Sequence, residues 1–162
     1  MCKVIAICGK ICSGKSYYAN ELKECEKAVI LSCDELTNIL FDNNLGEKHD
    51  EMTKRIREYL LTKTVDIIST NTNVILDWGF WSKKDRDYVK EYFRSKGIEC
   101  EMHYVCIDDI SWQKNITERN EKVLLGDGGS DYYLDDGLVK KLLSMWQEPS
   151  KEEIDIWFNL KR

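Results

Sequence analysis

The sequence has only one proline, Pro149, and only two histidines in 162 residues. No stretch has the composition of a flexible linker, a repeat or a low-complexity segment, so residues 1–162 are expected to form one domain with a sizeable core. No run approaches the roughly 18 consecutive apolar residues that a membrane-spanning helix needs, which predicts no membrane association. His49 and His103 have no partner visible in the sequence and are interpreted as structural or surface residues.

A surplus of positive charge is also missing. The 24 lysines and arginines are outnumbered by 29 acidic residues, giving a net charge of -5. Proteins that bind long nucleic acids usually present basic surface, so such a partner is not expected. Binding of a single nucleotide or a strand end stays open.

The seven cysteines do not form a recognisable framework. They are odd in number and scattered, and several fall in apolar runs, which predicts reduced thiols in a cytoplasmic protein. Cys8 and Cys12 have a spacing that a metal site can use. No second ligand pair with zinc spacing follows them, so ordinary thiols are favoured.

Short apolar runs alternate with longer amphipathic segments along the chain. The runs expected to be strands are 3–8, 28–32, 73–78, 102–107 and 155–160. The segments expected to be helices are 15–26, 35–43, 50–69, 82–96, 109–123 and 136–147. The apolar runs are nearly continuous, as in strands buried on both faces, so the pattern predicts an α/β fold with a doubly wound, parallel, five-stranded sheet. Such sheets bind ligands beyond the carboxyl ends of their strands.

A glycine-rich loop follows the first expected strand. Its residues are Gly9, Lys10, Ile11, Cys12, Ser13, Gly14, Lys15 and Ser16. They fit the pattern G-x-x-x-x-G-K-[ST] between a strand and a helix, which predicts a P-loop rather than a chance turn. The two glycines permit a close backbone approach to phosphate, Lys15 supplies a positive charge for the β- and γ-phosphates, and the Ser16 hydroxyl suits Mg²⁺.

Carboxylates follow the second and third expected strands. Asp34 suits either of two compatible roles, the N-cap of the next helix or the acceptor of a proton from an attacking hydroxyl. Asp77 ends its strand like a Walker-B carboxylate, so it is a candidate for Mg²⁺ or for the acceptor hydroxyl. The alternative is that Asp77 only caps a strand-end turn.

The residues after Asp77 are candidates for the acceptor pocket. Phe80 and Trp81 either line this pocket or belong to the core. Arg86 lies on a basic helical stripe, which is most often a solvated face, and is its member best placed to touch an anionic ligand.

The segment of about 110–137 is the candidate lid. Arg119 is the expected lid arginine because charge spreads over the γ-phosphoryl oxygens during transfer. Lys114 and Lys122 are weaker candidates. Alternatively, Arg119 is an exposed charge paired with Glu118 or Glu121.

Taken together, the motifs resemble those of a family of small P-loop kinases that is grouped with AAA-type ATP-binding proteins. The wider relatives of this family include the kinase domain of polynucleotide kinase, chloramphenicol phosphotransferase and the zeta toxins. The resemblance covers nearly the whole chain and rests on GKICSGKS, LSCDEL, VILDWGFWSKKDRD, MHYVCID, ITERN and WQEPSKEE.

The resemblance implies an adenylate-kinase-like fold with a helical lid, and binding of ATP and Mg²⁺. It implies that Lys15 and Ser16 carry nucleotide and metal, that Asp34 acts as base, that Asp77 lies near acceptor and metal, and that Arg119 is the lid arginine. Two departures from the family pattern concern the acceptor and the lid: Asn115 and Thr37 stand where many relatives have arginine.

The sequence therefore predicts an ATP-dependent phosphotransferase. The expected acceptors, in order, are a hydroxyl of a small molecule, a nucleoside or nucleotide, and a nucleic-acid 5′ end. The alternative from another class is a regulatory ATPase with a protein partner, which needs Lys15 and Ser16 but no base.

Overall fold

The computed structural model describes residues 1–42, 46–129 and 131–160. The strands are β1 Lys3–Cys8, β2 Ala28–Leu31, β3 Asn73–Gly79, β4 Glu99–Cys106 and β5 Ile156–Asn159. The α-helices are α1 Lys15–Glu26, α2 Cys33–Phe41, α3 His49–Ser69, α4 Lys83–Arg94, α5 Asp109–Leu124 and α6 Asp136–Met145. Two short 3₁₀ turns, η1 Gly46–Lys48 and η2 Lys151–Glu153, were not expected from the sequence.

The five strands form one parallel sheet in the order β2-β3-β1-β4-β5. The predicted fold class is therefore confirmed. Strand β1 lies at the centre, and its residues Val4 to Cys8 are fully buried. Because both faces of this strand are covered, its apolar run is continuous rather than alternating.

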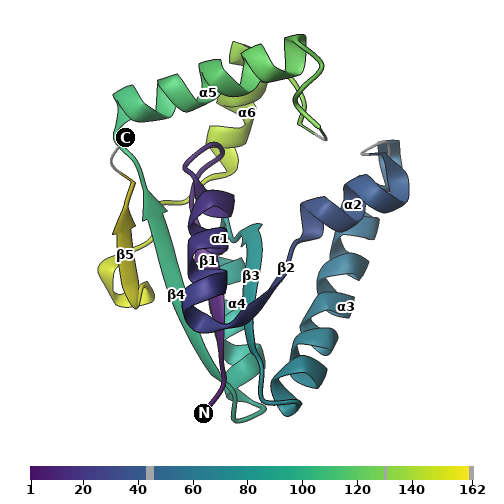
Figure 1. Ribbon diagram of the computed structural model, residues 1–162, viewed down its shortest axis with the longest axis vertical. Helices are drawn as coiled ribbons and strands as arrows, with labels where there is room; N and C mark the ends of the chain where they lie inside the picture. Colours follow the sequence, from purple (N-terminus) through teal and green to yellow (C-terminus); the bar gives the residue numbers. More distant parts are fainter. Residues whose placement is uncertain (43–45, 130, 161–162) are drawn as a thin grey trace.

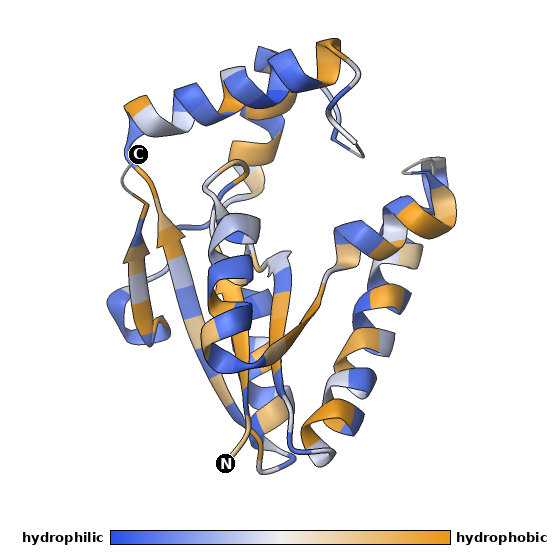
Figure 2. Ribbon diagram, in the orientation of Figure 1, coloured by the Kyte–Doolittle hydropathy of each residue, from blue (hydrophilic) through white to orange (hydrophobic). Residues whose placement is uncertain are grey.

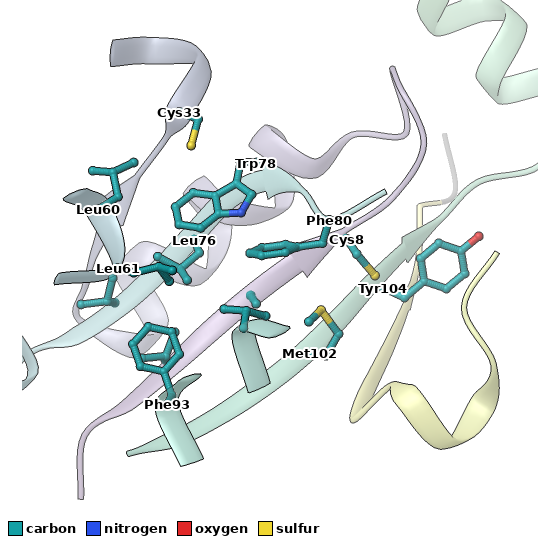
Figure 3. Packing of buried hydrophobic residues seen from close by; sticks show 14 of the residues in the cluster. Cys8, Cys33, Leu60, Leu61, Leu76, Trp78, Phe80, Phe93, Met102 and Tyr104 are labelled. Atoms are coloured by element: carbon teal, nitrogen blue, oxygen red, sulfur yellow. The ribbon is translucent and has the colours of Figure 1, made fainter. Parts of the chain in front are cut away.

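Alternate residues of the central strand enter two cores. Val4, Ala6 and Cys8 pack with side chains of α3 and α4, whereas Ile5 and Ile7 pack with side chains of α1. Figure 3 shows part of the first core, and Figure 2 shows the apolar residues along the strands. Because all strand pairs are parallel, the carboxyl ends of the strands lie at one edge of the sheet, where the loops that follow them meet.

Helices α5 and α6 do not cover the sheet but lie beyond the carboxyl ends of the strands, near the loop between β1 and α1 (Figure 1). They share a small core of their own, built around Trp112, Ile116 and Leu134, which includes Ile11 and Cys12 of that loop. The expected lid segment thus packs directly on the loop. Position 130 within this segment, and position 43 of the expected helix 35–43, lie outside the described residues.

Candidate functional site

The glycine-rich loop has the backbone that the motif requires. Cys12 and Gly14 have φ of 58° and 95°. A Cβ on Gly14 would lie 2.5 Å from Leu160 Cδ2, and one on Gly9 would lie 2.5 Å from Ser13 Oγ. The N-cap residue of α1 is Gly14, which has no side chain to accept a hydrogen bond from the helix. The first N–H groups of this helix are therefore left to face a ligand, which suits phosphate oxygens.

The Lys15 side chain folds back over the loop. Its ammonium donates to the carbonyl oxygens of Gly9 and Lys10 at 3.0 and 2.9 Å. An ammonium has three N–H donors, so these two bonds leave one for a phosphate oxygen. Burial lowers the pKa of Lys15, while the negative charges of Asp77 and Asp34 oppose this shift.

Ser16 and Asp77, the two residues expected to bind Mg²⁺, lie within hydrogen-bond distance of each other. The Ser16 hydroxyl donates to Asp77 Oδ2 at 2.9 Å. Asp77 is a residue of β3, opposite Ile7 of β1. Burial raises its pKa, and the neighbouring Lys15 and Ser16 partly offset this. A half-buried carboxylate beside a hydroxyl gives two hard oxygen donors, the chemistry that Mg²⁺ prefers, so these residues fit the ion.

Asp34 of α2 acts electrostatically on the same site. Its side chain is exposed in the first turn of the helix, and its charge acts on both Lys15 and Asp77. The interpretation of Asp34 as the helix cap is wrong, because Ser32 caps α2 by accepting a hydrogen bond from the Glu35 N–H at 3.3 Å. The serine performs the capping, and the Asp34 carboxylate therefore has no capping role.

A groove of about 520 Å³ opens beside these groups. It extends between α1 and β2 and includes Ser16, Asp77, Ser32 and Glu35 in its wall. Both polar side chains and apolar ones such as Ala19 and Val29 thus line the space next to the Ser16–Asp77 pair.

Three residues of α5 contact the loop from the lid side. The Trp112 indole N–H donates to the Ile11 carbonyl at 2.7 Å, and the Asn115 amide donates to the Cys12 carbonyl at 2.9 Å. Arg119 Nη1 lies 3.9 Å from Cys12 Sγ. Sequence reasoning missed Trp112 as a loop contact and took Asn115 only as a missing arginine. The spacing 112, 115, 119 on one helical face was the available signal.

Arg119 is held near the loop by the segment that follows α5. Its guanidinium lies 3.3 Å from Asp131 Oδ1 and 4.8 Å from the centre of the Tyr132 ring. Among the described residues the ion-pair partner of Arg119 is Asp131, whereas the expected alternative was Glu118 or Glu121. Lys114 is the residue that approaches Glu118, at 3.8 Å, and its side chain is 63% exposed. Lys114 therefore points to solvent and does not replace an arginine at the loop.

Two expected acceptor contacts have structural roles instead. Phe80 is 2% exposed and packs on Trp78 in the core, as Figure 3 shows. Arg86 is 1% exposed, and its guanidinium contacts Glu153 and three backbone carbonyls. The expectation that Arg86 touches an anionic ligand is thus corrected. Trp81 packs over Gly79 and is partly exposed, so its contact with an acceptor stays a prediction.

The fold and the loop together define the class of protein: a P-loop α/β protein with a helical lid. Residues 4–129 match the family described as AAA domain, and the chain belongs to this family. No curated protein matches the sequence.

Solved P-loop structures share the fold at low sequence identity. A gluconokinase from Sinorhizobium meliloti 1021 aligns with a TM-score of 0.65 and 14% identity, over 99% of this chain and 83% of its own. An APS kinase from Mycobacterium tuberculosis, solved with AMPPNP and APS, aligns with a TM-score of 0.61 and 16% identity, over 99% and 90%. Kti12 from Chaetomium thermophilum, solved with ADP-AlF3, aligns with a TM-score of 0.67 and 16% identity, over 97% and 88%.

Within the described parts of the chain, no helix combines the length and apolar character needed to cross a membrane.

Proposed function

We propose that this chain is an ATP- and Mg²⁺-dependent phosphotransferase that moves the γ-phosphoryl group to a hydroxyl of a small molecule or nucleotide. The observation that carries the proposal is the convergence of four chain regions. Lys15, Asp34 and Asp77 interact electrostatically at the carboxyl edge of the sheet, and Arg119 reaches the same loop from the lid.

The nucleotide phosphates would lie against the N–H groups of the loop and the start of α1. Lys15 would place its free donor on the β- and γ-phosphates. Ser16 and Asp77 would hold Mg²⁺, which when bound neutralises charge on these phosphates. Asp77 would also lie beside the acceptor.

Asp34 would accept the proton of the acceptor hydroxyl while the oxygen of that hydroxyl bonds to the γ-phosphorus. The bond from this phosphorus to the β–γ bridging oxygen breaks, and ADP is released. Arg119 would stabilise the charge that spreads over the three transferred oxygens. Moving the arginine toward these oxygens means exchanging its contacts with Asp131 and Tyr132 for contacts with the phosphoryl group.

A small hydroxyl compound is the favoured acceptor. The similarity in fold to a gluconokinase and an APS kinase supports this choice, and the net charge of -5 places nucleic-acid 5′ ends last. All seven cysteines are free, which supports a reducing compartment such as the cytoplasm.

The deciding experiment offers γ-labelled ATP to a pooled library of sugars, amino alcohols, nucleosides and oligonucleotides, and identifies the labelled product. With the acceptor in hand, Asp34→Asn is expected to lower kcat by about 10²–10⁴-fold, the usual contribution of a general base, while ATP still binds. Unchanged turnover in Asp34→Asn would remove the base assignment. If no acceptor is labelled and a protein partner strongly stimulates ATP hydrolysis, the chain is a regulatory ATPase instead.

A further inference from the structure

Arg86 lies at the point where two separate parts of the candidate site are joined. The side chain comes from the first turn of α4 and is fully buried. Its Nε donates to Glu153 Oε2 at 2.8 Å. Its Nη1 donates to the carbonyls of Phe80 and Gln147 at 3.1 and 3.0 Å. A buried guanidinium costs free energy unless it is paired, so this one is built into the fold through several partners at once.

One side of this contact is the turn that follows Asp77. Gly79 and Phe80 both have left-handed backbones, with φ of 84° and 43°. A non-glycine residue keeps such a conformation only where its surroundings fix it. The Gly9 N–H donates to the Gly79 carbonyl at 3.2 Å, and Arg86 binds the Phe80 carbonyl that follows. The turn is thus held by the P-loop at Gly79 and by Arg86 at Phe80.

The other side of this contact is the chain that leaves the lid. Gln147 follows the end of α6 at Met145 by two residues. Its N–H donates to the Trp81 carbonyl at 2.9 Å, and its side-chain oxygen accepts from the Lys83 N–H at 2.8 Å. Helix α6 packs with α5 in the lid core. Residue 147 therefore anchors the base of the lid to the turn after Asp77.

We propose that Arg86 is a positioning residue that locks the strand end carrying Asp77 to the base of the lid carrying Arg119. It contacts neither nucleotide nor acceptor. It sets the Mg²⁺-binding carboxylate in register with the P-loop and keeps the lid base on the same turn. The proposal rests on the proposed function only where it concerns phosphoryl transfer, because its effects on metal and lid are measurable without an acceptor.

The test compares Arg86→Lys with Arg94→Lys, a matched control on the same helix whose guanidinium is exposed and pairs with Glu91 one turn away. Affinity for ADP is measured calorimetrically with and without Mg²⁺, at a temperature where each variant is folded. Mg²⁺ should raise the affinity of the wild type for ADP by a certain factor. In Arg86→Lys this factor is expected to be about tenfold smaller, in the range found for groups that orient metal ligands. Its Mg²⁺-free affinity for ADP should change less than twofold, because the P-loop itself is intact. Arg94→Lys should match the wild type in both.

The lid half of the proposal has its own measurement. Lys122 is exposed near the end of α5. Trypsin should cut there several-fold faster in nucleotide-free Arg86→Lys than in Arg94→Lys. An unchanged Mg²⁺ increment or unchanged cleavage in folded Arg86→Lys would overturn the corresponding half of the proposal.

If Arg86→Lys does not fold, Glu153→Gln provides the test, because it keeps the arginine and removes only its charged partner. It should shift both readouts in the same direction by a smaller factor, and no shift in either would overturn the proposal. If the wild type binds Mg²⁺ and ADP but labels no acceptor, the proposed kinase activity is refuted. The positioning role of Arg86 can still be tested by the two measurements above.

Discussion

The half-buried carboxyl of Asp77, the proposed Mg²⁺ ligand, opposes the stability of the fold at neutral pH. Burial is the largest influence on its carboxyl and raises its pKa, although Lys15 and Ser16 act in the opposite direction. An acid whose pKa is higher in the folded state stabilises the fold while it is protonated. This contribution is present below the unfolded pKa, near the ordinary 3.8, and is lost as pH rises through the folded pKa. At neutral pH the ionised Asp77 therefore weakens the ligand-free protein.

Asp77→Asn is accordingly expected to stabilise the ligand-free protein and to abolish its metal response. A gain of about 1 kcal/mol, the order of a buried polar desolvation cost, would raise Tm by about 2–4 °C at neutral pH. The gain should disappear toward pH 3, where Asp77 itself becomes protonated. Thermal melts across pH, with and without MgADP, measure both effects. A lower Tm for Asp77→Asn at neutral pH would contradict the assignment.

Comparing variants of Arg119 and Lys114 shows which lid cation acts on the transferred phosphoryl group. Arg119→Ala is expected to lower kcat by about 10³-fold or more, as removal of an arginine that stabilises the transferred phosphoryl group does. Lys114→Ala should leave kcat within twofold, because its ammonium points to solvent beside Glu118. Steady-state kinetics with the identified acceptor make the comparison. Equal losses in the two variants would mean that the lid turns a different face to the nucleotide.

At the scale of elements, the start of α2 decides where Asp34 points. Ser32 ends the extended chain and caps the helix, so Asp34 falls in its first turn rather than at its end. Ser32→Ala should destabilise the protein by about 1 kcal/mol, the usual value of a lost cap, and should also lower kcat because the first turn frays. Denaturant unfolding and kinetics measure the two losses.

The conservative variant Ser32→Thr keeps a capping hydroxyl and should restore both stability and kcat. If Ser32→Ala lost stability with no loss of kcat, the orientation of Asp34 would not depend on the cap.

At the scale of the whole molecule, a nucleotide that contacts both the lid and the edge of the sheet should stabilise the fold. A ligand present at a hundred times its Kd adds about 2.7 kcal/mol to the free energy of unfolding. In a domain of this size this raises Tm by about 5–10 °C. Calorimetric melting with MgADP tests the effect. Lys15→Ala should lose most of the rise, and an equal rise in this variant would place the nucleotide elsewhere.

The sequence by itself predicted the five strands and six α-helices, but not the turns η1 and η2, and it predicted the glycine-rich loop. Continuous apolar runs arise because the central strands are buried on both faces, and the loop from Gly9 to Ser16 is contiguous, so local patterns specify both. The proximity of Asp34 and Asp77 to this loop could also be predicted, because the carboxyl ends of parallel strands meet at one edge of a sheet.

Only the tertiary structure decided the roles of Arg86, Phe80 and Asn115. Helical periodicity placed Arg86 on a basic stripe, but its partners Glu153 and Gln147 are more than sixty residues away in the chain. Phe80 was equally suited to a pocket or to the core, and only its packing on Trp78 distinguishes them. From the sequence, Asn115 was only a position that lacks the arginine of many relatives. The structure shows that its amide donates a hydrogen bond to the Cys12 carbonyl. Periodicity predicts which face of a helix is polar and which is apolar. Packing between residues distant in the sequence determines what each face contacts.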